Sequence, residues 1–486
     1  MAAAAPPPPP PAHRMQELAH FFRKLTPSAV LSDCLGFGGI GKMPAHLAEL
    51  WEHAVIVGID TEAWTLNTKE MTEIGIVIFE RKDMVAVQQQ QYQQQKQEEQ
   101  TPGNQAASTK KEYEHLGPFG EQLLTQIRFH HLRLVETAHL RTNSAHMRGP
   151  DGNHFGHSRF VTFAEARAIL PSIFAQPIGS PDSSSAALHA PNRPIVLIGH
   201  ATHHDSEHCR AGLGYDWTQH GTIVKSIDTQ PLAKATRTWI SPDKQRVDIG
   251  LARLTKILGF EHRDAHTACN DAARTVLSAV QMVLPRACRT GQSCSMQAVA
   301  LRVEQFSRDA FASSWGTRWC CTRCGGRDHN RSACTVSVHC RACQQFGCGA
   351  KDVVGHIEQY CPHIARYNAH LRRKADALKR RRNVPVEPPC IHPEYDENSK
   401  VEVKRWNEKG FTVVDEDFPA LPQRSAEANK GETEGCGDES GPAVRGMARL
   451  ALSEKGPEER SVRKRRRYVL KERHEIRRRG YSDWAF

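Results

Sequence analysis

Two short apolar runs rich in β-branched residues constrain the fold of this chain most strongly. They cover residues 55–59 (Val-Ile-Val-Gly-Ile) and 74–79 (Ile-Gly-Ile-Val-Ile-Phe), and such runs are typical of buried β-strands. The first run continues into Asp60, Thr61 and Glu62. Side chains two residues apart on a strand point to the same face, so the two carboxylates are expected to project together. The pair is either a solvated strand end or part of a cation site.

Further apolar or alternating runs predict a mixed α/β fold. Strands that come first and are then interleaved with helices imply one five-stranded mixed sheet with flanking helices. Thr162 is a good N-cap for a helix predicted at about 160–174. This domain is expected to span 50–290, after a tail and a short helix at 1–49. Strands are expected at about 54–62, 72–80, 126–135, 194–199 and 222–228, and helices at about 14–25, 160–174, 249–258 and 263–283.

Two segments inside this domain have a low-complexity composition. Glutamine dominates the first, at about 86–115, and serine is frequent in the second, at about 176–193. Such segments lack the apolar side chains needed for packing, so both are predicted to be disordered inserts. The charged residues 366–486 are predicted to be a disordered basic tail, apart from local helices.

The overall composition limits the partners and the compartment. The chain of 486 residues has a formal net charge of +11 and a pI of about 9.0. This charge favours a polyanionic partner, with nucleic acid ahead of a membrane surface. No apolar run approaches the roughly 18 residues that a membrane span needs. The alanine- and proline-rich start lacks the regions of a secretory signal, so we expect a protein of the nucleus, the cytoplasm or both.

More acidic residues, and one prominent histidine, follow the later strands. Asp205 comes shortly after the fourth strand, and His266 and Asp271 lie near the start of the last helix. Taken singly, they are compatible with a helix N-cap, a polar helix residue and a surface acid. Together with the acidic pair of the first strand, they form a set of hard oxygen ligands beside an imidazole. An alternative zinc site would use a neighbouring run of histidines: His200, His203 and His204.

The order and spacing of these residues resemble the DEDDh group of 3′→5′ exonucleases, within the ribonuclease H-like superfamily. The patterns are Asp-x-Glu on the first strand, Gly-His-x(4)-Asp after the fourth and His-x(4)-Asp at the last helix. A sister group has tyrosine four residues before the last aspartate, where this chain has Thr267. Residues 58–62, 127–132 and 154–156 also resemble a fungal set of such domains that is associated with RNA export and silencing.

This resemblance implies an active site with two metal ions. Phosphodiester cleavage puts negative charge on the attacking and leaving oxygens, and two Mg²⁺ or Mn²⁺ ions about 4 Å apart can neutralise both. By resemblance, Asp60 would bridge both ions and Asp205 would support one of them. Glu62 and Asp271 would hold the other. His266 would accept the proton of the attacking water, and the products would be nucleoside monophosphates.

A dense group of cysteines and histidines follows, within residues 315–365. Eight of the fifteen cysteines lie between Cys320 and Cys361, which in a chain without an export signal favours zinc over disulfides. Four ligands in a short loop favour tetrahedral Zn²⁺, whose binding supplies folding energy. One set has the complete CCHC spacing: Cys321, Cys324, His329 and Cys334. Cys320 is an alternative to Cys321 as the first ligand of this set, but its spacing is poorer.

This set resembles the CCHC zinc knuckle of retroviral nucleocapsid and cellular RNA-binding proteins. Gly325 agrees with that pattern, whereas Asp328 and Thr322 replace a glycine and an aromatic residue. Trp319 is a candidate substitute for the aromatic residue. Knuckles bind unpaired bases by stacking and by hydrogen bonds to base edges, so single-stranded RNA is the expected partner.

A second set resembles a knuckle with a longer central loop. Cys348 competes with His356 for its fourth position, and Phe346 and Tyr360 are either stacking platforms or part of a small core. The predicted ligands are Cys340, Cys343, His356 and Cys361.

Basic runs close the chain after the cysteine-rich region. Such runs bind phosphate backbones, act as nuclear import signals, or form solvated charged helices. The apolar segment 417–422 is a candidate docking motif for a protein partner. The basic runs cover residues 372–374, 379–382, 463–467 and 477–479.

Together these features predict a metal-dependent 3′→5′ exonuclease that acts on RNA or single-stranded nucleic acid and holds the strand with one or two zinc knuckles and a basic tail. Two alternatives remain open at this stage. One is a catalytically inactive RNA-binding or RNA-export adaptor with the same fold. The other is a DNA proofreading or repair exonuclease.

Overall fold

The computed structural model describes six segments of the chain: residues 11–89, 113–140, 148–179, 191–240, 248–290 and 292–382. The chain divides into two units, Met1–Tyr395 and Asp396–Phe486, and every described residue belongs to the first. Most of the two predicted inserts lies outside the described residues. So do the tail beyond residue 382, the last two basic runs and the segment 417–422.

The described residues contain one six-stranded sheet with the strand order β4-β3-β2-β1-β5-β6. β2 is antiparallel to both β1 and β3, whereas the β1–β5, β5–β6 and β3–β4 pairs are parallel. The predicted mixed α/β fold is confirmed, and it is that of a ribonuclease H-like domain, but the sheet has one strand more than the five predicted. The strands are β1 (Val55–Trp64), β2 (Asn67–Glu80), β3 (Arg128–Leu134), β4 (Ser158–Val161), β5 (Ile195–Gly199) and β6 (Ile223–Asp228).

The strand that sequence analysis missed is β4, at the edge of the sheet. It has four residues and ends directly before Thr162, so its pattern merges with the helix predicted at 160–174. That helix is α6 (Phe163–Phe174), and Thr162 is its N-cap, as predicted. The Thr162 hydroxyl accepts a hydrogen bond from the backbone N–H of Glu165, and the Glu165 carboxylate accepts one from the backbone N–H of Thr162. This capping box fixes the start of α6 beside the sheet edge.

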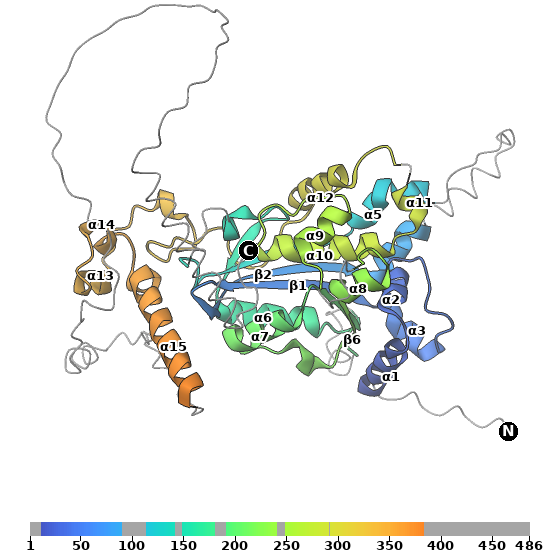
Figure 1. Cartoon of the computed structure of the whole chain (residues 1–486), viewed down its shortest axis with the longest axis horizontal. Coiled ribbons are helices and arrows are strands. Elements are labelled where there is room, and N and C mark those ends of the chain that lie inside the picture. Colours follow the sequence, from blue (N-terminus) through green and yellow to red (C-terminus); the bar gives the residue numbers. More distant parts are fainter. Residues whose placement is uncertain are drawn as a thin grey trace, which may run out of the picture. The chain divides into compact units, whose positions relative to one another are not determined.

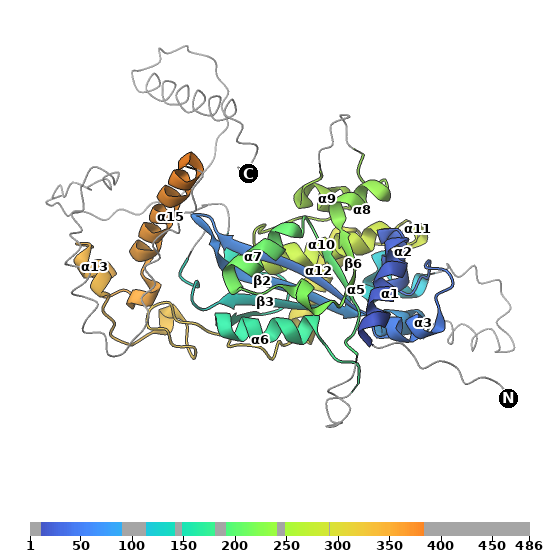
Figure 2. The same cartoon turned by 90° about the horizontal axis from the view of Figure 1, so that it is seen from below.

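Helices cover both faces of the sheet (Figures 1 and 2). α10 (Ala268–Val283) packs on β1 and β2 from one side, and α6 and α7 (His203–Leu213) lie on the other. Consecutive strand residues alternate between the faces, so Ile56 belongs to the apolar core under α10 and Val57 to the core under α6. The sheet therefore separates two cores.

Glycine allows α10 to approach the sheet closely. A Cβ atom at Gly75 of β2 would lie 2.1 Å from the backbone oxygen of Ala268, the first residue of α10. A Cβ atom at Gly58 of β1 would lie 2.4 Å from the Val276 side chain. A larger residue at either position would push the helix away, so these glycines bring the first turn of α10 against the strands.

The N-terminal region is more structured than the predicted tail and short helix. Its first helix buries Leu18 and Phe22 and packs on β6, where the Lys225 ammonium donates 2.8 Å hydrogen bonds to the backbone oxygens of Phe22 and Leu25. The indole of Trp51 donates a 2.7 Å hydrogen bond to Asp33. The three helices are α1 (Pro11–Arg23), α2 (Pro27–Cys34) and α3 (Ala45–Glu52).

The remaining elements are mostly short. α15 (Pro362–Arg382) continues well past residue 366, where the predicted tail begins. Among the described helices, none is both long enough and apolar enough to cross a membrane. The other α-helices are α5 (Glu121–Leu124), α8 (Thr229–Ala235), α9 (Leu251–Ile257), α11 (Arg286–Arg289), α12 (Met296–Ala310), α13 (Arg341–Gln345) and α14 (Ala350–Val353). The 3₁₀ turns are η1 (Glu114–Leu116), η2 (Pro118–Gly120), η3 (Gly149–Gly152), η5 (Trp217–His220), η6 (Arg331–Ala333) and η7 (Glu358–Tyr360).

Candidate active site and metal-binding clusters

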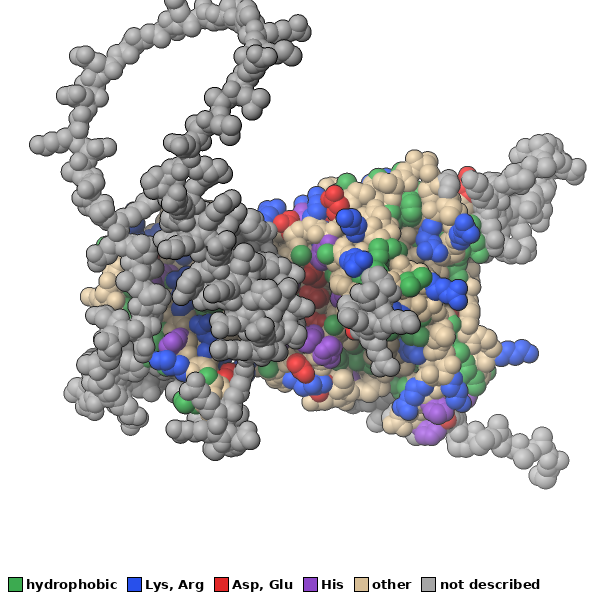
Figure 3. Space-filling model, viewed as in Figure 1, with side chains coloured by type: hydrophobic (Ala, Val, Ile, Leu, Met, Phe, Trp, Pro, Cys, Tyr) green, Lys and Arg blue, Asp and Glu red, His purple; other side chains and the backbone are tan. Residues whose placement is uncertain are grey.

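Three elements bring the predicted acidic residues to one region of the sheet. Asp60 and Glu62 lie on β1, Asp205 lies in the first turn of α7, and Asp271 lies in the first turn of α10. Because β1 and β5 are parallel neighbours and α7 follows β5, these positions converge. On the face drawn in Figure 3, recessed acidic side chains lie beside histidine side chains.

Glu62, His266 and Asp271 form a compact group. Each offers one ligand atom that lies within 4.8 Å of the other two. Nδ1 of His266 lies 3.5 Å from Oε1 of Glu62, and the backbone N–H of His266 donates a 3.1 Å hydrogen bond to Oδ2 of Asp271. The structure thus brings together three of the five residues that were predicted to be catalytic.

Asp60 and Asp205 adjoin this group. Oδ1 of Asp205 accepts 2.8 Å hydrogen bonds from the backbone N–H and from the hydroxyl of Thr61, which hold the carboxylate against β1. The charge of Asp60 interacts with those of Asp205, Asp271 and Glu62. All four predicted carboxylates therefore share one electrostatic environment.

Burial and mutual repulsion make this group of carboxylates unfavourable in its charged form. Burial, followed by the charges of the other acids, raises the pKa of Asp60 well above its ordinary value. Burial, followed by the charge of Glu62, raises the pKa of Asp271 to about 8. Burial also raises the pKa of Asp205 to about 7, against the hydrogen bonds from Thr61.

Two oxygen atoms of this group lack a hydrogen-bond donor among the described residues. Oδ2 of Asp60 and Oδ1 of Asp271 are buried and accept no hydrogen bond from the described residues. A buried acceptor without a donor is costly, and crowded carboxylates are the preferred ligands of hard divalent cations. The donor set therefore fits Mg²⁺ or Mn²⁺.

His266 lies just outside the helix that was predicted to carry it. α10 begins at Ala268, so His266 belongs to the preceding loop, where its φ of +62° is uncommon for a residue other than glycine. Its side chain is 54% exposed. The hydrogen bond and charge of Glu62, with the charge of Asp271, raise the pKa of His266. The loop thus holds an accessible imidazole against the acids.

Hydrogen bonds from neighbouring segments fix this loop. The Thr267 hydroxyl donates to the backbone oxygen of Gly149 at 2.6 Å. Nε2 of His154 lies 2.7 Å from Oδ2 of Asp264, a second residue of the loop with positive φ. The Asn270 side chain also bridges the two segments, since it donates to the backbone of Asp264 and accepts from the backbone N–H of His154. The segment 149–154 therefore positions His266.

Sequence reasoning missed two side chains at the site. Glu73 of β2 lies opposite Glu62 in the strand register, and its Oε2 lies 2.7 Å from Nε2 of the buried His131. Nε2 of His262 lies 3.4 Å from Oδ1 of Asp271, and burial lowers the pKa of His262 to about 3. An acid at the start of an apolar run is a signal that could have identified Glu73. Nothing in the spacing distinguishes His262.

The histidine run after β5 gives no support to the alternative zinc site. Nδ1 of His200 lies 2.7 Å from the Thr229 hydroxyl, which indicates a structural role. Within the described part of the chain, no group of three or more metal-binding side chains includes His200, His203 or His204.

A known protein family matches much of this domain. Residues 103–282 match the family model DEDDh_C, described as the C-terminal domain of DNA polymerase III subunit epsilon-like proteins. The chain contains a DEDDh exonuclease-family domain. The match includes Asp205, His266 and Asp271, whereas Asp60 and Glu62 precede its first residue. No curated protein matches the chain.

This match supports a nuclease function for the DEDDh domain. DEDDh exonuclease domains use divalent metal ions, in agreement with the buried carboxylate oxygens at the site that accept no hydrogen bond from the described residues.

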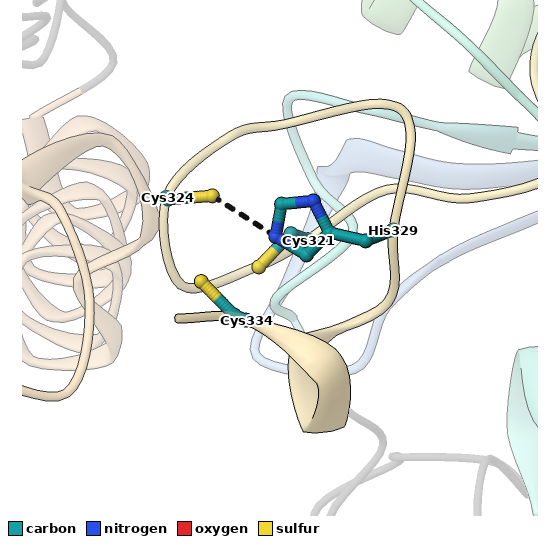
Figure 4. Close-up of side chains that lie close together, drawn as sticks. All are labelled: Cys321, Cys324, His329 and Cys334. Carbon is teal, nitrogen blue, oxygen red and sulfur yellow. Dashed lines mark hydrogen bonds between the residues drawn. The ribbon is translucent and has the colours of Figure 1, made fainter. Parts of the chain in front are cut away.

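The first cysteine–histidine cluster has the arrangement of a zinc knuckle. Its four ligand atoms lie within 4.8 Å of one another, and the side chains point toward a common centre (Figure 4). Sγ of Cys324 lies 3.4 Å from Nε2 of His329. Cys320 is not part of this group, and its Sγ lies 3.7 Å from the Tyr360 hydroxyl. The cluster consists of Cys321, Cys324, His329 and Cys334 and is compatible with Zn²⁺.

The second cluster is completely buried. Sγ of Cys343 lies 3.4 Å from Nε2 of His356 and 3.6 Å from Sγ of Cys361. Cys348 instead groups with Cys343 and His363, so the geometry favours His356 as the fourth ligand. The four side chains are Cys340, Cys343, His356 and Cys361, and they too could bind Zn²⁺.

The first cluster packs directly on the DEDDh domain. The backbone of Thr317 pairs with that of Phe160 through two hydrogen bonds of 2.8 and 2.9 Å. The Arg327 guanidinium donates to both carboxylate oxygens of Glu165, at 2.9 and 2.8 Å. The cluster is thus attached to β4 and to the start of α6.

Proposed function

We propose that this protein is a metal-dependent 3′→5′ exonuclease that acts on RNA or other single-stranded nucleic acid. The observation that carries the proposal is the convergence of Glu62, His266 and Asp271 beside Asp60, whose buried Oδ2 has no hydrogen-bond partner among the described residues. Hydrolysis by water at the 3′ end would release nucleoside monophosphates.

Each residue has a role in this proposal. Asp60, Glu62, Asp205 and Asp271 would hold two divalent cations, which when bound supply positive charge for the attacking and leaving oxygens. His266 would accept the proton of the attacking water, because its side chain is exposed and adjoins the acids. His262 would orient Asp271, whose Oδ1 lies 3.4 Å from its Nε2.

The zinc clusters would bind the strand that the DEDDh domain trims. Two CCHC-type sites and a net charge of +11 favour RNA. The basic tail would add phosphate contacts, and segment 417–422 would recruit a protein partner. We place such an activity in the nucleus, the cytoplasm or both.

A second candidate is a DNA-directed exonuclease. It is favoured by the description of the matching family model, which refers to a DNA polymerase subunit. A parallel series of RNA and DNA substrates with the same sequence separates the two candidates by the ratio of their kcat/KM values.

The decisive experiment uses the full chain with 5′-labelled RNA that carries a 3′ overhang. In Mn²⁺ or Mg²⁺ we expect a ladder of products that shorten from the 3′ end, together with nucleoside monophosphates. Asp60→Asn keeps the side-chain size but removes a ligand charge, and should lower the rate by at least about 1,000-fold. His266→Ala should lower it by about 100- to 10,000-fold.

Asp309→Asn is the matched control, because Asp309 is an exposed acid on α12 outside the site. Its rate should equal that of the wild type. Tight RNA binding without any cleavage, by both the wild type and Asp60→Asn, would refute the enzyme and support the alternative of an RNA-binding adaptor.

A further inference from the structure

We propose that a basic cleft between the DEDDh domain and the first zinc cluster binds the backbone and bases of a single-stranded nucleic acid. The inference rests on the proposed function and extends it to a second site. The cleft has a volume of about 1560 Å³. One wall comes from β3, β4 and the segment 148–151, and the other from residues 318–332, from Asp352, His356 and Tyr360 near the second cluster, and from the start of α15. It is therefore large enough for several nucleotides.

The charge of the cleft favours a polyanion. Six arginines line it, against the two acidic residues Asp151 and Asp352. Asp151 neutralises only part of this charge, by accepting a 2.8 Å hydrogen bond from one of these arginines. Arg159 and Arg331 donate hydrogen bonds to backbone oxygens. Because these oxygens carry no full negative charge, the contacts do not neutralise the two guanidinium groups. The six are Arg133, Arg148, Arg159, Arg318, Arg331 and Arg366.

Aromatic side chains make the cleft more suitable for unpaired bases than for an acidic protein. The Trp319 indole is 38% exposed, which is unusual for a tryptophan. The Arg318 guanidinium lies 4.9 Å from its ring centroid. An exposed aromatic ring beside arginines is the combination on which single-stranded nucleic acids stack. A paired duplex does not offer its base faces to such a ring.

The walls of the cleft are fixed to each other. The backbone pairing of Phe160 with Thr317 joins them at one point, and the Arg327–Glu165 pair joins them at a second. Tyr360 packs with Phe160 in a small apolar cluster. A strand that enters the cleft therefore meets a preformed surface.

One wall continues into the active-site loop. Arg148 lies in the cleft, and its Nη1 lies 3.7 Å from Oδ2 of Asp264. The backbone oxygen of the next residue, Gly149, accepts the hydrogen bond from Thr267, directly after His266. A strand held in the cleft would thus have its 3′ end near His266, and a substrate too short to reach the cleft would lose these contacts.

The test compares two double variants of the full chain. Arg318→Glu/Arg366→Glu changes two exposed cleft arginines, and Arg23→Glu/Arg286→Glu changes two exposed arginines elsewhere. Binding of a fluorescent 20-nucleotide oligo-U or oligo-dT strand is measured by anisotropy without added divalent cation. We expect the cleft variant to bind at least tenfold more weakly. The slope of log K against log salt concentration should become less steep by about 1.4. The control should change by less than about threefold.

Trp319→Ala tests the cleft without a change of charge. It should weaken binding by about tenfold at every salt concentration and leave the salt slope unchanged. Equal losses in the cleft and control variants, with normal binding by Trp319→Ala, would overturn the proposal. So would competition by polyglutamate that matches competition by unlabelled strand, since it would identify an acidic protein surface as the ligand.

Hydrolysis in Mn²⁺ separates this proposal from the proposed function. A dinucleotide should be cleaved equally by the wild type and the cleft variant, whereas kcat/KM for the 20-mer should fall at least tenfold in the variant. Equal rates on both substrates would refute the cleft alone. If neither the wild type nor the cleft variant cleaved either substrate, the proposed exonuclease function would be refuted. The binding measurements would then decide by themselves whether the cleft holds a strand. Comparison of oligo-U with oligo-dT identifies the preferred sugar.

Discussion

Arg327 of the first zinc cluster region and Glu165 of α6 are joined by two parallel hydrogen bonds, of 2.9 and 2.8 Å. The same Glu165 carboxylate accepts a 2.7 Å hydrogen bond from the backbone N–H of Thr162 and so completes the capping box of α6. One side chain therefore both stabilises a helix of the DEDDh domain and attaches the zinc cluster to that domain.

Three variants should separate these two contributions. Thr162→Ala removes the cap and should lower the free energy of unfolding by about 1 kcal/mol, with no change in binding of a 20-mer. Arg327→Lys removes the bidentate contact and should weaken 20-mer binding by about fivefold, with little change in stability. Glu165→Ala removes both contacts and should do both. Thermal unfolding and fluorescence anisotropy measure the two effects, and loss of binding in Thr162→Ala would contradict the separation.

Divalent cations should stabilise the protein through the four carboxylates of the active site. At 100 times its dissociation constant, a cation that binds only the folded state contributes about 2.7 kcal/mol. We expect Mn²⁺ to raise Tm by about 5–8 °C. Asp60→Asn should raise Tm slightly without Mn²⁺, because it removes repulsion, and should lose at least half of the Mn²⁺ effect. The measurement is a calorimetric titration of Tm with Mn²⁺.

Asp309→Asn is again the control, and its Mn²⁺ effect should equal that of the wild type. An unchanged Mn²⁺ effect in Asp60→Asn would show that the cation stabilises the protein at another site.

The features that the sequence pattern could predict are those set by local periodicity and spacing. The strands that carry Asp60 and Glu62 and that precede Asp205 begin as uninterrupted apolar runs, and the capping residue Thr162 is a local signal. Both cysteine–histidine clusters follow from ligand spacing, because four ligands in a short segment have few other ways to meet.

The features that could not be predicted depend on tertiary contacts. β4 is a four-residue strand that exists because it pairs with β3. His266 leaves the helical pattern because Thr267 and Asp264 bond to residues more than a hundred positions away. Glu73 joins the site only through the register of β1 with β2. The basic cleft combines arginines from three separate parts of the sequence, which no local pattern reveals.

The contact between His154 and Asp264 should control the rate of hydrolysis more than substrate binding. Both side chains are largely buried, and their hydrogen bond of 2.7 Å fixes the loop that carries His266. Asp264→Asn tolerates the positive φ but weakens this bond. We expect kcat on a dinucleotide to fall about tenfold with KM nearly unchanged. His154→Gln, which retains a hydrogen-bonding side chain, should have a smaller effect.

The readout for this prediction is steady-state kinetics in saturating Mn²⁺, together with Tm. A variant that loses stability but keeps the wild-type kcat would show that the contact has only a structural role.

Zinc content should identify the ligands of the second cluster. The wild-type chain should contain two zinc ions after purification without chelator. Cys361→Ser should contain one, whereas Cys348→Ser should keep two, because Cys348 groups with a different pair of side chains. Elemental analysis by mass spectrometry measures the ratio. A loss of one zinc ion in Cys348→Ser as well as in Cys361→Ser would instead replace His356 by Cys348 as the fourth ligand.

The stability of the sheet should fall in acid partly through Glu80, the last residue of β2. Its carboxylate contacts Arg193 at 2.6 Å, Lys82 at 2.9 Å and Arg128 at 3.3 Å. Burial would raise the pKa of Glu80, but hydrogen bonds from Arg193 and Lys82 outweigh it and lower the pKa to about 2. The folded state thus holds this carboxylate ionised at pH values where the unfolded chain binds a proton.

Because the folded-state pKa lies below the unfolded value, the contribution of Glu80 is complete above pH of about 4.5 and disappears as the pH falls toward about 2. Glu80→Gln should therefore lower the free energy of unfolding by about 1–2 kcal/mol at pH 7, and the difference from the wild type should shrink between pH 4.5 and pH 2. Urea unfolding at several pH values measures it, with the exposed Glu49→Gln as control. A difference that stayed constant down to pH 2 would assign the loss to packing, since only the charged contacts depend on ionisation.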